Sequence, residues 1–260
     1  MARPNHGSTV STAAHEAQDA RTEGEPRGIG QQVRVVAQDK LDAEPEPDFA
    51  DGVITVVNAD GTTAQFATFG EALAYSDDGD ILQVGMGTYS EAFELDESVT
   101  IVGETGAVLD GSSIVGNATG FTSTIEVYDG FSGGSISGIE VVAVQGGSAF
   151  ETITGEAVND ISLQDNTFDA GANSAGSLVY FNPGTTNAEV VGNTFEGALL
   201  AASPFLGIEA DNVLVSGNDF GEHPDSYVEV EVFPGLNLST ADVELVGNSG
   251  LEEGDVFITP

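Results

Sequence analysis

The chain has 260 residues, no cysteine, and a formal net charge of −38 at pH 7. Its five cations all lie in the first 40 residues, and they are Arg3, Arg21, Arg27, Arg34 and Lys40. Since that segment also holds five acids, residues 41–260 carry the whole net charge without a single Lys or Arg. Residues 41–260 therefore cannot neutralise phosphates, so we expect no nucleic-acid partner. The lack of cysteine excludes disulfides and thiolate metal sites.

The uncompensated charge indicates the solvent in which the protein works. Carboxylates repel one another over a Debye length of about 8–10 Å in ordinary buffer, but over only about 3 Å near 1 M salt. With 40% apolar and 18% charged residues, the composition favours a folded protein over an acidic disordered tail. We therefore expect adaptation to high salt, as in a halophilic archaeon.

The N-terminal region differs from the rest of the chain. Residues 1–50 are rich in Ala, Gln, Glu and Arg and end in an acidic, proline-containing run, so we expect them to be disordered. They lack the apolar core of a secretory signal, and no stretch approaches the roughly 18–20 apolar residues of a membrane span. The sequence as written thus predicts neither an export signal nor membrane insertion. Residues 51–260 are expected to form the folded domain.

The first elements of this domain follow in chain order. The run VITVV from Val53 predicts a strand, which a turn at Asn58–Gly61 ends. Thr68 and Glu71 have the spacing of a capping box, so a short helix should begin there and end at Asp77–Asp80. The later runs ILQVG, FEL, VTIVG and AVLDG are strand-length, and Gly or Asp closes each of them.

The second half of the chain repeats itself. The segments 161–168, 188–195, 213–220 and 243–250 share alternating apolar residues followed by Asn, and Phe comes two residues later in three of them. The repeated positions are Asn166, Asn193, Asn218 and Asn248, with Phe168, Phe195 and Phe220. A period of about 25–30 residues with several short strands predicts a solenoid, in which each turn stacks on the last.

These repeated residues have a structural explanation. Asn tolerates the left-handed backbone conformation, and its amide can bond to the Asn one turn away. Phe two residues later would point inward and stack on its counterparts. We therefore interpret both sets as a structural ladder and not as catalytic residues.

Two stretches together resemble the right-handed parallel β-helix superfamily, the pectin-lyase-like fold. The segment Thr68–Gly111 is similar to its usual opening, with a capping helix, a strand after Gly-Asp and a G-x-Y-x-E turn. The V-x-G-N-x-F turns supply the second likeness. The resemblance implies an all-β, right-handed parallel β-helix of seven or eight turns with a short N-terminal capping helix. It also implies an extracellular or cell-surface location.

The resemblance does not extend to the enzymes of this fold. The pentapeptide Gly87–Glu91 is similar to a motif of pectin methylesterases, but those enzymes also need an Arg that holds galacturonate. Pectate lyases need an Arg or Lys base, and polygalacturonases need an Arg-x-Lys motif. Because residues 41–260 contain no Arg or Lys, these activities lack required parts.

The remaining candidates for chemistry are few. His223 lies beside Glu222 and Asp225, so the three residues form a candidate acid–base or metal site, although a surface turn also explains them. Asp77, Asp78 and Asp80 crowd one turn and form a candidate site for weak calcium binding. We expect no other cofactor.

The sequence leaves three functional hypotheses open. The leading one is a non-catalytic scaffold of the cell surface or envelope that binds carbohydrate or calcium weakly, with polysaccharide or envelope components as partners. The second is a polysaccharide hydrolase that uses a pair of carboxylates. The third is a fragment of a larger repeat protein.

Overall fold

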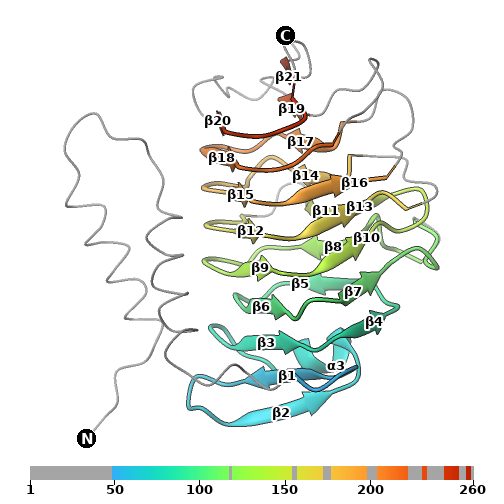
Figure 1. Ribbon diagram of the computed structural model, residues 1–260. Coiled ribbons are helices and arrows are strands. Elements are labelled where there is room, and N and C mark those ends of the chain that lie inside the picture. Colours follow the sequence, from blue (N-terminus) through green and yellow to red (C-terminus); the bar gives the residue numbers. More distant parts are fainter. Residues whose placement is uncertain are drawn as a thin grey trace, which may run out of the picture.

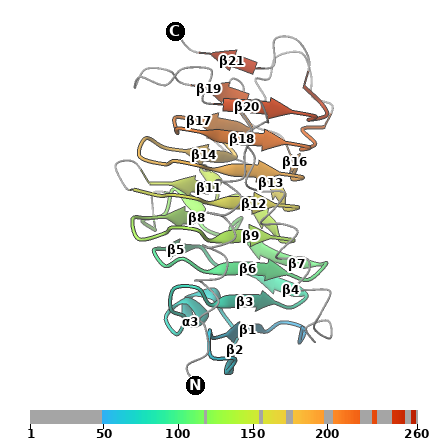
Figure 2. The same cartoon turned by 90° about the vertical axis from the view of Figure 1, so that its left-hand side faces the viewer.

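A computed structural model describes residues 49–116, 119–153, 157–171, 177–197, 204–221, 230–232, 243–251 and 256–258. The described chain winds upward as a right-handed parallel β-helix, and its first five turns each contribute a strand to all three sheets (Figures 1 and 2). The seven strands of one sheet mark seven turns in the described part of the chain, within the expected seven or eight. The fold class predicted from the sequence is therefore confirmed.

The three sheets run along the solenoid axis. Sheet A contains, in spatial order, β2 (Thr63–Phe66), β1 (Ile54–Val57), β3 (Ile81–Val84), β6 (Thr100–Gly103), β9 (Ser135–Ser137), β12 (Ser162–Gln164), β15 (Glu189–Val191), β18 (Val213–Ser216) and β20 (Val243–Val246). Sheet B contains β4 (Gly87–Tyr89), β7 (Ala107–Asp110), β10 (Glu140–Val142), β13 (Thr167–Asp169) and β16 (Thr194–Glu196). Sheet C contains β5 (Phe93–Leu95), β8 (Ser123–Val127), β11 (Ser148–Thr152), β14 (Val179–Phe181), β17 (Leu206–Ile208), β19 (Val230–Val232) and β21 (Val256–Ile258).

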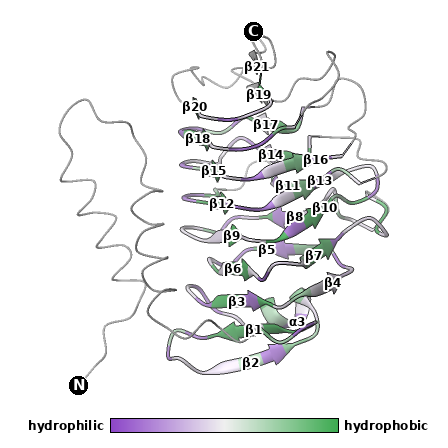
Figure 3. Ribbon diagram, in the orientation of Figure 1, coloured by the Kyte–Doolittle hydropathy of each residue, from purple (hydrophilic) through white to green (hydrophobic). Residues whose placement is uncertain are grey.

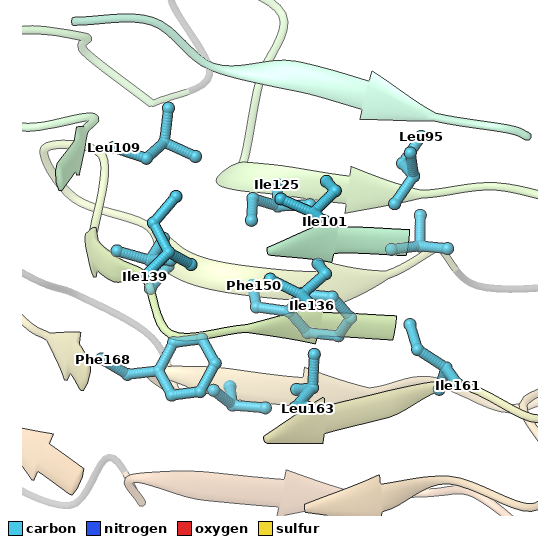
Figure 4. Packing of buried hydrophobic residues seen from close by; sticks show 14 of the residues in the cluster. Leu95, Ile101, Leu109, Ile125, Ile136, Ile139, Phe150, Ile161, Leu163 and Phe168 are labelled. Carbon is cyan, nitrogen blue, oxygen red and sulfur yellow. The ribbon is translucent and has the colours of Figure 1, made fainter. Parts of the chain in front are cut away.

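One core fills the space between the sheets. Alternate residues of each strand point inward, so the strands carry both hydrophobic and hydrophilic positions (Figure 3). Equivalent residues of successive turns pair in register, as Ile101, Ile136 and Leu163 do in sheet A. These side chains pack against residues of sheets B and C, among them Phe168 and Phe150 (Figure 4).

Three elements cover the N-terminal end of the solenoid. Strands β1 and β2 extend sheet A in antiparallel pairing, and the helix α3 (Phe69–Leu73) packs beside them. The expected strand at 53–57 and the expected helix are present, whereas β2 was not predicted from the sequence. The Thr68 hydroxyl caps the helix by accepting a hydrogen bond from the Glu71 amide at 3.2 Å.

The helix cap differs from the predicted capping box in its second partner. The carboxylate of Glu91 accepts hydrogen bonds from the amides of Phe69 at 2.7 Å and Gly70 at 3.1 Å. Glu91 comes from the turn after β4, far from the helix in sequence. The local pattern therefore predicted the start of the helix, and a residue of the next turn completes its cap.

The predicted asparagine ladder is present, with Asn166, Asn193 and Asn218 buried and Asn248 partly buried. Each side-chain oxygen accepts bonds from the backbone and side-chain amides of the Asn one turn below, with distances of 2.9–3.1 Å between Asn193, Asn218 and Asn248 and their neighbours. Each amide also donates to a strand carbonyl, as from Asn193 to Leu163 at 2.9 Å. The ladder thus satisfies polar groups that would otherwise be buried without partners.

One part of the asparagine prediction was wrong. The left-handed backbone conformation belongs to the residue before each ladder Asn, for example Asp165 with φ of 52° and Gly192 with φ of 68°. A second, exposed ladder that the sequence analysis missed does use left-handed Asn. It runs from Asp160 through Asn187 to Asn212 at distances of 2.9 and 2.5 Å.

The phenylalanine prediction is confirmed. Phe168 and Phe195 are 5.6 Å apart between ring centroids, and Phe195 and Phe220 are stacked 4.6 Å apart with nearly parallel planes at 8°. All three rings are buried. A matching pair, Phe150 and Phe181, lies 5.7 Å apart in sheet C.

Candidate functional site

Three of the residues singled out from the sequence, Glu222, His223 and Asp225, lie outside the described residues. Their role as an acid–base or metal site therefore stays a prediction. The same holds for the expected disorder of residues 1–50, of which residues 1–48 are outside the described part. Within the described part, no helix is long and apolar enough to cross a membrane.

The calcium candidates Asp77, Asp78 and Asp80 lie where the chain leaves α3. Asp80 is 3% exposed, and its two oxygens accept bonds from the amides of Ala59 at 3.0 Å and of Asp77 at 2.9 Å. Asp78 accepts a bond from the Ser98 amide at 2.9 Å. These carboxylates therefore tie neighbouring turns together, and the described residues contain no group of three or more acids or histidines arranged to hold a metal ion. Calcium binding here remains a prediction.

The outer face of sheet C gathers a different set of polar residues. The register of β5, β8, β11 and β14 places Glu94, Glu126, Glu151 and Tyr180 in one column, on successive turns. Neighbouring strands are about 4.8 Å apart, so three carboxyl side chains start from adjacent positions. Like charges stacked in this way destabilise a sheet unless protons or hydrogen bonds compensate them.

Glu126 is held from several sides and is 2% exposed. Its Oε1 accepts bonds from the backbone amide and hydroxyl of Thr122, the latter at 2.9 Å, and from the Ser123 amide at 3.2 Å. Its Oε2 accepts a bond from the Tyr128 hydroxyl at 3.2 Å. This carboxylate therefore fixes the segment through which the chain enters β8.

Glu151 lies one turn further and shares a partner with Glu126. Its Oε2 is 3.1 Å from the Thr122 hydroxyl oxygen, and its Oε1 accepts a bond from the Asn182 side-chain amide at 2.9 Å. Burial raises the pKa of Glu151 above its ordinary value, and the charge of Glu126 adds to this rise. The bonds from Asn182 and Thr122 oppose the rise but do not cancel it.

Tyr180 forms an aromatic surface above this pair. Its half-buried ring lies across Gly207 of the next turn, where a Cβ atom would come within 2.3 Å of Tyr180 Cδ2 and 2.4 Å of Cε2. The Tyr180 hydroxyl donates to Glu209. Glycine at position 207 thus allows the ring to lie flat against the sheet, with carboxylate and amide groups beside it.

The burial of Glu126 limits the chemistry of this face. Two-carboxylate glycoside hydrolysis needs both groups to reach the scissile bond. The raised pKa of Glu151 suits a general acid. Glu126, however, is bound by Thr122, Ser123 and Tyr128 and is too deeply buried, at 2% exposed, to reach a sugar. The arrangement is therefore better suited to holding a ligand beside Tyr180 than to cleaving it.

Sequence reasoning missed this face for a physical reason. Glu126, Glu151 and Tyr180 belong to segments without the V-x-G-N-x-F pattern, so their common register was not visible. The acids were also hidden among 43 Asp and Glu residues. The signal that could have found them is the spacing of Glu126, Glu151 and Tyr180 in strand-like runs, which is close to the repeat period.

The fold and this face define a parallel β-helix protein with a polar and aromatic outer surface. No protein-family model matches the chain, and no curated protein sequence matches it. Similar solved structures include pectin methylesterase PemA from Erwinia chrysanthemi, at 10% identity and a TM-score of 0.31, and a pectin methylesterase in complex with hexasaccharide VII, at 9% and 0.29. Each covers 75% of this chain and 89% of its own. A likeness this weak adds no argument about activity.

The pentapeptide that resembles a pectin methylesterase motif is structural in this chain. Besides the cap that Glu91 provides, the Tyr89 hydroxyl oxygen lies within hydrogen-bond distance of two carbonyl oxygens, of Gly85 at 2.9 Å and of Val53 at 3.2 Å. The Tyr89 ring also packs edge-on against Phe69 at 5.5 Å. These contacts hold the N-terminal cap on the first turn of the solenoid.

Proposed function

We propose that the protein is a non-catalytic β-helix scaffold that binds a neutral polysaccharide along the outer face of sheet C. The observation that carries this proposal is the Tyr180 ring lying on Gly207 with Glu209 bound to its hydroxyl. An aromatic ring held flat offers an apolar surface to the C–H face of a sugar, and its polar neighbours can accept hydrogen bonds from sugar hydroxyls. The straight, stacked face of a solenoid suits an extended polymer.

Charge supports a neutral ligand over an acidic one. Residues 41–260 contain no Lys or Arg that could pair with a uronate carboxylate. The surrounding carboxylates would repel an anionic polymer, more strongly in dilute buffer than in high salt. The ligand class that fits is therefore a polysaccharide rich in hydroxyl groups and free of acidic groups.

The net charge also indicates the environment in which the protein would carry out the proposed function. A cell surface or envelope exposed to concentrated salt would screen the repulsion within this acidic body. We therefore infer that the scaffold belongs to a halophilic cell and contacts envelope polysaccharide there. Hydrolysis by a carboxylate pair is the less favoured function, because Glu126 is 2% exposed.

Affinity electrophoresis in high salt, with neutral and uronate polysaccharides in the gel, tests the proposal. We expect retardation by at least one neutral polymer and none by polyuronates. Tyr180→Ala should abolish the retardation, whereas Tyr75→Ala should not, because Tyr75 is a 46% exposed tyrosine at the far N-terminal cap. Release of reducing ends during the assay would support the hydrolase instead.

A further inference from the structure

The Thr122 hydroxyl bridges two carboxyl groups with a single proton. Its oxygen lies 2.9 Å from Glu126 Oε1 and 3.1 Å from Glu151 Oε2, both within hydrogen-bond distance. A hydroxyl donates one hydrogen bond, so it can serve only one of two ionised carboxylates. The other carboxylate would then face a lone pair of the same oxygen at close range.

The neighbouring bonds decide which carboxyl is the acceptor. Glu126 accepts from the Thr122 and Ser123 amides and from the Tyr128 hydroxyl, so it has the environment of an ionised carboxylate. Glu151 accepts only from Asn182 on its Oε1 among these bonds, and its Oε2 faces Thr122. A proton on Glu151 Oε2 could donate to Thr122, which would donate in turn to Glu126. Each donor in this row of hydrogen bonds, from Glu151 through Thr122 to Glu126, then has a matching acceptor.

Among the residues that the structure describes, no Lys or Arg can supply a positive charge in place of that proton. The groups that titrate around Glu151 are Glu126 on β8, Tyr128 after it, Tyr180 on β14 and Glu209 beside Tyr180, with Glu94 one turn further away on β5. All of these are neutral or negative. Residues 41–260 hold no Lys or Arg, so removing the proton leaves two adjacent negative charges without compensation.

We propose that a proton on Glu151 links this residue through Thr122 to Glu126, and that losing this proton is a pH-sensitive switch that loosens the segment before β8 from sheet C. The segment is residues 119–122, which leads into the strand at Ser123. In the protonated state Thr122 is tied to both turns. In the ionised state Thr122 keeps its contact with Glu126 and loses the bond from Glu151. The Ser148 amide, which donates to the Thr122 carbonyl at 3.0 Å, then holds the segment to the next turn without help from Glu151.

The direction of the pH dependence follows from the position of Glu151. Its pKa is raised in the folded protein, chiefly by burial, so the folded state binds the proton more tightly than the open state does. The stabilisation is therefore complete below the ordinary glutamate pKa and is lost as the pH rises through the raised value. Within this window the closed state should weaken about tenfold for each pH unit.

Amide hydrogen exchange measured by NMR tests the switch, since Thr122 and Ser123 report on the segment directly. In the wild-type protein their protection should fall between about pH 4 and about pH 8, relative to the Ile139 amide, which bonds to the Asn166 side chain in the buried ladder. Glu151→Gln mimics the protonated acid, so it should remove this fall. Glu94→Gln, an exposed change in the same column, should leave it intact.

The carboxyl carbon of Glu151 provides an independent readout in the wild-type protein. It should titrate above the ordinary glutamate range, and Glu126→Gln should lower its midpoint by removing the neighbouring charge. A Glu151 that titrates at or below the ordinary value would overturn the proposal, even if a variant fails to fold. So would protection of Thr122 that is equal in wild type and Glu151→Gln at about pH 8. Neither measurement involves a polysaccharide, so its result is separate from that of the binding assay.

Discussion

The carboxylate of Glu91 accepts a 2.7 Å hydrogen bond from the amide of Phe69, 22 residues earlier in the chain. Through this bond the turn after β4 completes the N-terminus of α3 and fastens the cap to the first turn of the solenoid. The cap matters because it covers a core end that includes Phe69 stacked on Phe93 at 4.8 Å.

Removing this carboxylate should destabilise the cap. We expect Glu91→Ala to lower the free energy of unfolding by about 1–2 kcal/mol, the usual cost of losing a helix-capping acceptor. The sequence alone indicated Glu71 as the capping-box partner, and it is exposed. Glu71→Ala should therefore change stability by less than about 0.5 kcal/mol. Urea unfolding followed by circular dichroism compares the two, and equal effects would refute the assigned roles.

The buried asparagine ladder should contribute more to the free energy of unfolding than the exposed ladder does. Asn193→Ala removes the acceptor for the Asn166 backbone amide and for its side chain, both of which are buried. Each buried group left without a partner costs about 1–3 kcal/mol, so for two groups we expect a loss of about 2–6 kcal/mol. Asn187→Ala removes only side-chain contacts at the surface and should cost about 1 kcal/mol. Similar losses in the two variants would contradict the account of the ladders.

The acidic outer face of sheet B should make stability depend on pH. Burial raises the pKa of Glu140, and the charges of Asp169, Glu196 and Asp110 add to the rise. Its stabilising proton is fully bound below the ordinary glutamate pKa and is lost as the pH rises through the raised value.

We therefore expect Glu140→Gln to be more stable than wild type near neutral pH and no more stable at about pH 4. The gain should stay below about 1 kcal/mol, since Glu140 is partly exposed to solvent. Thermal unfolding at the two pH values measures it, with exposed Glu94→Gln as the control. A gain at about pH 4 alone would contradict the sign of the effect.

Salt should stabilise the whole body of the protein. With a net charge of −38 and no Lys or Arg after residue 40, screening relieves repulsion that no internal ion pair with Lys or Arg can offset. We expect the melting temperature to rise steadily as potassium chloride increases towards molar concentrations. A protein that is equally stable after dialysis into dilute buffer would contradict the expected adaptation to high salt.

The sequence predicted the fold better than the candidate site. Residues that repeat for packing reasons, such as Asn193 and Phe195, recur at one position of each turn and so reveal the solenoid period. Glu91 and Glu151 act through partners that are distant in sequence. Their contacts depend on how the turns pair, and the loops between strands differ in length from turn to turn. Local patterns could not show that Thr122 meets both carboxyls, or that Gly207 makes room for Tyr180.

The central claim is that the Tyr180 ring on sheet C binds neutral polysaccharide. Gly207→Ala tests it most directly, because the added methyl group would lie 2.3 Å from Tyr180 Cδ2 and must displace the ring without removing it. Affinity electrophoresis in high salt should show a neutral polymer that retards the wild-type protein and Tyr75→Ala, but not folded Gly207→Ala. Equal retardation of wild type and Gly207→Ala, or retardation of neither by any neutral polymer, would contradict the account.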